Sequence, residues 1–233
     1  MLTFGKKTKK PKKEELEEEE MSSEESEEET DGFEDEEAPM SLLDLLGAAG
    51  GAAAEVPESR SIMFVGEVTE SRAADLISAL LVLSQTKEKG QERADDIKLY
   101  ISTYGGSADE MFGIYDVMNF CKQFCDIQTI GLGKVMSAGT LMLSAGTKGK
   151  RKLGKHCRVM VHSVNGGQVG DIHNLQNELE QTVALQDSYI QAMSDETRMS
   201  KKQIQSLINQ KVNVYLTAEE AIEKGLADEV LDG

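Results

Sequence analysis

The sequence predicts an α/β fold with mainly parallel strands, and two observations predict it. Short apolar runs alternate with helical segments at a spacing of about 30 residues. Paired glycines, Gly105–Gly106 and Gly166–Gly167, follow two of the apolar runs, as expected where strands end in turns. Because an intervening helix returns the chain to the same edge of the sheet, strands in this order pair in parallel. No repeat of fixed period is evident.

An acidic tail precedes the expected fold. Residues 1–59 contain 6 lysines and 19 acidic residues, so they carry −13 of the net charge of −17. Residues 1–37 have almost no apolar side chains to bury, which predicts disorder. Within the tail, Met40–Gly47 is short and amphipathic; it is either a linker with an apolar patch or a docking peptide. We divide the chain into a disordered acidic tail and linker (1–59) and a folded domain (60–233).

Composition excludes several classes of function. The domain carries a net charge of only −4, which argues against a nucleic-acid partner, since phosphate binding needs clustered lysine and arginine. No apolar run approaches the ~20 residues that cross a membrane. The N-terminal lysines are followed by glutamates, unlike a secretory signal or a transit peptide. Three cysteines, Cys121, Cys125 and Cys157, fit a reducing cytoplasm and are interpreted as buried thiols rather than metal ligands.

The elements follow from apolar patterning. Strands are expected where short apolar runs end at glycine or charged residues, and helices where apolar residues recur every three to four positions. The expected strands are 61–65, 97–102, 126–131 and 158–162. The expected helices are 70–85, 107–121, 136–146 and 171–194. For the first helix the expected apolar stripe is Ala74, Ile77, Leu80, Leu81 and Ser84.

Three polar or glycine positions stand just past strands, where active sites of parallel α/β folds form. Ser137 follows a strand and a glycine-containing turn and begins an apolar helix, which suits a nucleophile; a helix N-cap is the alternative. His162 ends a strand and is either a general base or a structural histidine. Gly105–Gly106 forms either an oxyanion hole or a tight turn. Together the three positions favour catalysis.

Seven stretches give these positions a specific context, because they occur in the order and near the spacing of one family. The domain resembles the Clp protease proteolytic-subunit family over residues 60–231. The matching stretches are Leu99–Ser107, Gly113–Asp116, Gly133–Gly146, Gly149–Arg151, Arg158–His162, Gly166–Gly167 and Thr217–Gly225. The resemblance implies a spiral of β-β-α units, shared with crotonases, and a protruding handle helix.

The resemblance also implies roles for individual residues. It assigns Ser137 as nucleophile and His162 as general base, with the backbone N–H groups of Gly106 and Ala138 as oxyanion-hole donors. The implied substrate-binding residues are Gly105, Gly166 and Gly167.

Two departures from the family pattern stand out. Where the family has the triad aspartate, ahead of the Thr217–Gly225 stretch, this chain has Asn213. An amide can hold the histidine ring but cannot stabilise imidazolium by charge. Residues 53–59 do not match the family segment that gates the pore and helps the unfoldase to dock.

The resulting prediction is a serine endopeptidase subunit that hydrolyses unfolded proteins or peptides without a cofactor. The resemblance implies stacked heptameric rings of this chain, or mixed rings with a paralogue, and an ATP-driven Clp-type unfoldase as partner. Because of Asn213, the alternative remains open that the chain is a weakly active or non-catalytic ring subunit. The acidic tail leaves open a viral capsid-maturation protease of the same fold, whereas the Ser137 and His162 pair argues against a crotonase-type enzyme acting on acyl thioesters.

Overall fold

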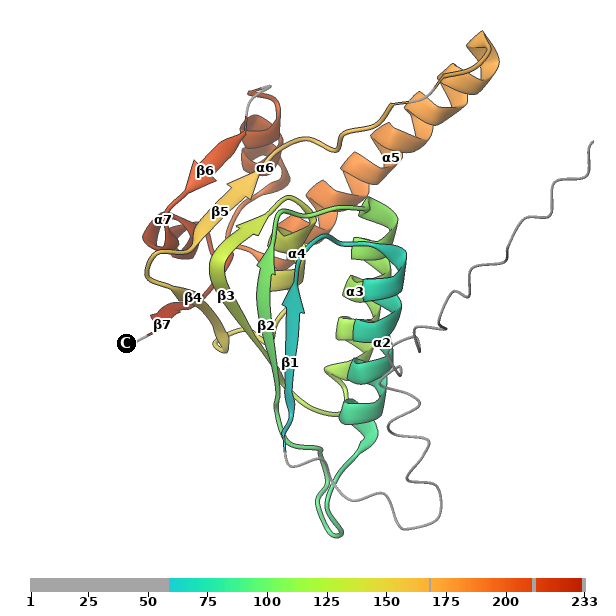
Figure 1. Ribbon diagram of the computed structural model, residues 1–233. Helices are drawn as coiled ribbons and strands as arrows, with labels where there is room; N and C mark the ends of the chain where they lie inside the picture. Colours follow the sequence, from blue (N-terminus) through green and yellow to red (C-terminus); the bar gives the residue numbers. More distant parts are fainter. Residues whose placement is uncertain (1–58, 168, 211–212, 232–233) are drawn as a thin grey trace, which may run out of the picture. The chain divides into compact units, whose positions relative to one another are not determined.

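A computed structural model describes residues 59–167, 169–210 and 213–231, so residues 1–58 of the expected tail lie outside the described residues. The expected α/β class is confirmed: a seven-stranded, mostly parallel sheet is packed with helices (Figure 1). The strands are β1 (Ser61–Val65), β2 (Ile97–Thr103), β3 (Ile127–Met136), β4 (Arg151–Gly154), β5 (Arg158–Val161), β6 (Val214–Leu216) and β7 (Glu229–Leu231). In the described residues, no helix has the length and apolar character that crossing a membrane requires.

Strand β3 organises the sheet. Its first half pairs in parallel with β2 and β4, in the order β1-β2-β3-β4-β7. Its last three residues, Lys134–Met136, pair with β5, and Val135 also pairs with Thr103 of β2. Strand β5 pairs antiparallel with β6. Met136 lies opposite Met160 in this register. The residues that directly follow β3 and β5 are therefore neighbours, although 25 positions separate Ser137 from His162.

The helices are α2 (Glu70–Gln85), α3 (Ala108–Cys121), α4 (Ala138–Ser144), α5 (Ile172–Glu196), α6 (Lys201–Ile208) and α7 (Ala218–Glu223). Helices α2 and α3 lie side by side against one face of the sheet, and α5 projects away from it (Figure 1). Every residue of α4 is buried. The core is built from aliphatic side chains and methionines of β2, β3 and these helices, including Leu80, Ile97, Leu99, Ile114, Met118 and Leu141.

The apolar stripe expected for α2 agrees with the structure except at Ala74, which is exposed. Leu80 and Ser84 are buried, and Ile77 and Leu81 are partly buried and pack against the core. The buried face is wider than this stripe and comprises Ala73, Leu76, Ala79, Leu80, Leu83 and Ser84. The reason is that α2 packs against both the sheet and α3.

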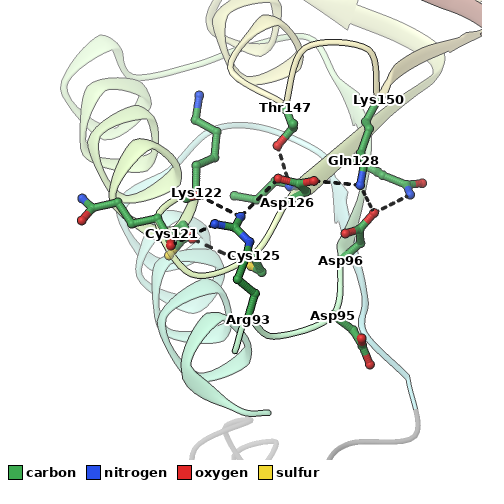
Figure 2. Close-up of polar contacts among 12 residues, drawn as sticks. Arg93, Asp95, Asp96, Cys121, Lys122, Cys125, Asp126, Gln128, Thr147 and Lys150 are labelled. Atoms are coloured by element: carbon green, nitrogen blue, oxygen red, sulfur yellow. Dashed lines mark hydrogen bonds and ion pairs between the residues drawn. The ribbon is translucent and has the colours of Figure 1, made fainter. Parts of the chain in front are cut away.

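Charged residues tie the amino-terminal ends of the central strands together (Figure 2). Lys150, just before β4, donates to Asp96 at 2.6 Å and lies 2.8 Å from a carboxylate oxygen of Asp126. These aspartates directly precede β2 and β3, and Arg93 also pairs with Asp126 at 3.3 Å. This network connects three loops at the amino-terminal ends of β2, β3 and β4, whereas Ser137 follows the carboxyl end of β3.

All three cysteines are buried and free, which confirms that they are structural thiols. Two of them, Cys121 and Cys125, belong to the same end of the molecule as the ion-pair network (Figure 2). Burial raises the pKa of both Cys125 and Cys157 to about 11. The thiols therefore stay protonated and unreactive at neutral pH.

Candidate active site

Ser137 stands between β3 and α4 in a rare backbone conformation. Its φ is 53°, and no other non-glycine residue in the described part of the chain has a positive φ. It occupies the N-cap position of α4, yet its side chain makes no capping hydrogen bond. The Oγ atom instead lies 2.7 Å from Nε2 of His162. Ser137 is therefore the N-cap residue by position, but its side chain does not cap the helix; the strained turn presents the hydroxyl to the histidine.

Hydrogen bonds on both sides hold this strained serine. Its N–H donates to the carbonyl of Met160 at 2.8 Å, which extends the pairing of β3 with β5. Its carbonyl accepts from the hydroxyl of Thr140 at 2.6 Å. Since that hydroxyl has one proton, it must accept in turn from the Tyr189 hydroxyl, 2.7 Å away. Burial raises the pKa of Tyr189 to about 12, so this phenol remains a donor at neutral pH.

His162 directly follows β5 and is half-buried. The 2.7 Å distance between its Nε2 and Oγ of Ser137 puts the candidate base within hydrogen-bond reach of the candidate nucleophile. Burial lowers the pKa of the imidazole below its ordinary value, because desolvation disfavours the charged ring. The ring is therefore neutral at neutral pH, the state in which it can accept a proton. Its other nitrogen, Nδ1, lies 3.4 Å from the amide nitrogen of Asn165.

The backbone at Gly105 packs closely against Ser137, and the backbone at Gly106 packs closely against Val68. Their φ values are 100° and 153°, which favour glycine. A Cβ on Gly105 would lie 2.5 Å from Cβ of Ser137, and one on Gly106 would lie 2.3 Å from the carbonyl oxygen of Val68. Only residues without side chains fit this close approach.

Two N–H groups next to the serine are available to a ligand. Within the described residues, no acceptor hydrogen bonds to the N–H of Gly106, whose neighbours Gly105 and Ser107 make the backbone contacts with Val68. Ala138 is the first residue of α4, so its N–H has no partner within the helix. These are the two donors that the resemblance implied. Ala138 follows Ser137 in the chain, and Gly106 lines the same cavity as Ser137.

A cavity of about 540 Å³ opens over the serine and histidine. Among the residues that the structure describes, its lining contains no Asp, Glu, Lys or Arg. Gly166 and Gly167, predicted to line the substrate cleft, do not line this cavity and belong to no strand. The lining is Tyr104, Gly106, Ser107, Ala108, Met111, Ser137, Ala138, Met160, His162, Ser163, Val164, Asn165, Tyr189 and Asn213.

The remaining predicted residues occupy different places. Gly105 packs against Ser137 and lines a second cavity of about 330 Å³. Asn213 lines the main cavity and is exposed; among the residues that the structure describes, its side chain has no hydrogen-bond partner. Sequence reasoning missed Asn165, Thr140 and Tyr189. The position of Asn165, three residues after the candidate base, was the one available signal.

The arrangement defines a class of site. A hydroxyl hydrogen-bonded to a neutral imidazole, next to two free backbone N–H groups, can attack a carbonyl carbon and hold the resulting oxyanion. These are the elements shared by serine hydrolases on unrelated folds.

Comparisons with known proteins agree with this class. The sequence model of the Clp protease family matches residues 51–233. The chain is 33% identical over 171 residues, 73% of its length, to proteins named ATP-dependent Clp protease proteolytic subunit 2 from Thermobifida fusca (strain YX) and from Parasynechococcus marenigrum (strain WH8102). The match covers 80% and 83% of these relatives. The identity is also 33% to proteolytic subunit 1 of Synechococcus sp. (strain CC9902). The chain therefore belongs to the Clp protease family.

Proposed function

We propose that this protein is a serine endopeptidase subunit that cleaves peptide bonds of unfolded proteins or peptides. The observation that carries the proposal is the 2.7 Å contact between Oγ of Ser137 and Nε2 of His162, made by a serine whose strained turn serves no capping role. Family membership gives the reaction class, since the relatives are named as proteolytic subunits.

In the proposed reaction, Oγ of Ser137 attacks the peptide carbonyl carbon while Nε2 of His162 takes the hydroxyl proton. The carbonyl oxygen gains negative charge and accepts hydrogen bonds from the N–H groups of Gly106 and Ala138. His162 then gives the proton to the leaving amine, which departs and leaves an acyl-serine. Water, deprotonated by the same imidazole, hydrolyses the acyl-serine and restores the hydroxyl. No cofactor is needed for these steps.

Two amide side chains are candidates for the residue that orients His162, the role of the triad acid. Asn213 stands where the resemblance places the triad acid and lines the same cavity. Asn165 contacts Nδ1 of His162. Neither carries charge, so imidazolium forms without a carboxylate to stabilise it, which favours a slow enzyme.

No carboxylate lines the cavity among the described residues, which also supports a second candidate function, a weak or non-catalytic subunit of a mixed ring. In that case a paralogue supplies most of the hydrolysis and this chain contributes structure. The two candidates differ in whether Ser137 reacts when the chain is purified alone.

We further propose that the domain, beginning near residue 60, winds as a spiral of β-β-α units with α5 as its handle. Four apolar side chains on α5 are exposed and recur every three to four residues: Ile172, Leu175, Leu179 and Val183. Such a stripe suits burial against a second copy of the chain. It supports the ring assembly, homomeric or mixed, that family membership suggests. An ATP-driven unfoldase as partner and a cytoplasmic location belong to the same proposal.

The test is covalent labelling with a fluorophosphonate, which reacts with activated serines, together with peptide hydrolysis. We expect the wild-type protein to be labelled, and the Ser137→Ala variant to lose both labelling and hydrolysis. The control is Ser206→Ala, which removes an exposed hydroxyl on α6. Light scattering should give the same mass for all three proteins. Equal hydrolysis by Ser137→Ala would refute the assignment, whereas an unlabelled but assembled wild type would favour the non-catalytic subunit.

A further inference from the structure

A histidine base depends on what its second ring nitrogen contacts. The proton position on Nδ1 decides whether Nε2 offers a lone pair to the nucleophile or points a proton at it. In the described part of the chain, the side chain that contacts Nδ1 of His162 is Asn165, whose amide nitrogen lies 3.4 Å away. Asn213 lies in the same cavity but has no such contact.

We propose that Asn165, and not Asn213, positions the His162 ring, acting as an uncharged partner of Nδ1. The inference rests on the proposed function, in which His162 is the base. The local chain path supports it: Asn165 is three residues beyond His162, so one short segment that leaves β5 carries both the histidine and its partner. Asn213 reaches the cavity from the separate segment that enters β6.

The chemistry of an amide has a direct consequence for catalysis. When the Asn165 nitrogen donates to Nδ1, the ring proton sits on Nε2 and points at Oγ of Ser137. This form cannot take the serine proton. A half-turn of the amide presents its oxygen instead, which accepts from Nδ1–H and frees the lone pair of Nε2. Asn165 therefore holds the ring without fixing its tautomer, whereas a carboxylate would accept only the catalytic form.

Among the residues that the structure describes, no Asp, Glu, Lys or Arg lines the cavity. Besides His162, the titratable side chains of this lining are Tyr104 and Tyr189. Tyr189 is engaged with Thr140, and the ammonium of Lys134 lies over the Tyr104 ring at 4.5 Å from its centre. Within the described part of the chain, the ring of His162 is therefore oriented by hydrogen bonding and packing.

The experiment compares two equal changes in one cavity, Asn165→Asp and Asn213→Asp. The chain has three histidines, so NMR of labelled histidine can follow each ring, and His162→Gln identifies the signal. We expect Asn165→Asp to raise the pKa of His162 by about 0.5–1 unit and to shift the ring towards the Nδ1–H tautomer. The shift in Asn213→Asp should be smaller.

Kinetics give a second readout. In Asn165→Asp the acid limb of kcat/KM should move to higher pH by the same amount as the His162 pKa. Removing the amide in Asn165→Ala should lower kcat/KM by roughly 3- to 10-fold, the range expected for one neutral hydrogen bond. Because Asn165 is exposed, these variants remove no core contact, and light scattering checks their assembly.

A larger pKa or tautomer change in Asn213→Asp than in Asn165→Asp would overturn the inference, as would no change in Asn165→Asp. The NMR titration does not require turnover. A protein that fails to label at Ser137 therefore contradicts the proposed function without deciding the partner of His162, and the titration decides the partner by itself.

Discussion

Gly105 packs against the candidate nucleophile Ser137, and its substitution tests how closely the site is packed. A Cβ added at Gly105 would lie 2.5 Å from Cβ of Ser137 and 3.0 Å from its Oγ. Carbon atoms in contact prefer about 3.5–4.0 Å, so Gly105→Ala must displace the serine, the glycine backbone or both by about 1 Å. Misplacing a reacting group by this distance can cost about 100-fold in rate. We expect kcat/KM to fall by about that factor.

A matched control separates displacement from backbone strain. Gly149 also has a positive φ, 86°, but a Cβ there would meet no atom within 4 Å. Gly149→Ala therefore imposes the strain of about 1–3 kcal/mol without any clash at the site. It should lower stability and leave activity near the wild-type value.

The assay measures peptide hydrolysis and the rate of fluorophosphonate labelling at a temperature where both variants are folded. Urea unfolding gives the stability of each. The reasoning fails if Gly105→Ala and Gly149→Ala show the same activity. It also fails if Gly105→Ala loses activity only in proportion to the fraction that is unfolded.

Two further predictions concern pH and stability. Burial lowers the pKa of His162, and a base must be neutral to act. The midpoint of the acid limb of kcat/KM should therefore lie below pH ~6.5, and a midpoint above that value would contradict this. Arg151 is 4% exposed and donates to Asp228 at 2.9 and 2.6 Å, so Asp228→Asn should cost about 3–5 kcal/mol in urea unfolding. Glu229→Gln, at a half-exposed ion pair with Lys152, should cost at most about 1 kcal/mol; equal losses would refute this distinction.

The main elements could be predicted because their signals are local. Strands at 61–65 and 97–102 and helices at 70–85 and 107–121 agree with the structure to within a residue. Apolar runs and the glycines that end them act over a few positions, so a single sequence carries that information.

The elements that were missed depend on partners far away in the chain. Strands β4, β6 and β7 have only three or four residues each, too few for a periodic pattern. Helices α6 and α7 are also short, although each begins with a capping box, at Ser200 and at Thr217. Strand β3 was expected to end at residue 131 but runs to Met136, because its last residues pair with β5.

The sequence alone determined the candidate nucleophile and base. Ser137, His162 and the paired glycines each follow an apolar strand, and parallel strands bring their carboxyl ends to one edge. The sequence could not decide whether Asn165 or Asn213 contacts the histidine, because that depends on the path of the chain after β5. Only the tertiary structure brought Tyr189 of α5 to Thr140 and so to the carbonyl of Ser137. The physical reason is range: strand ends are set by neighbouring residues, whereas a hydrogen bond between distant segments exists only once the core has placed both.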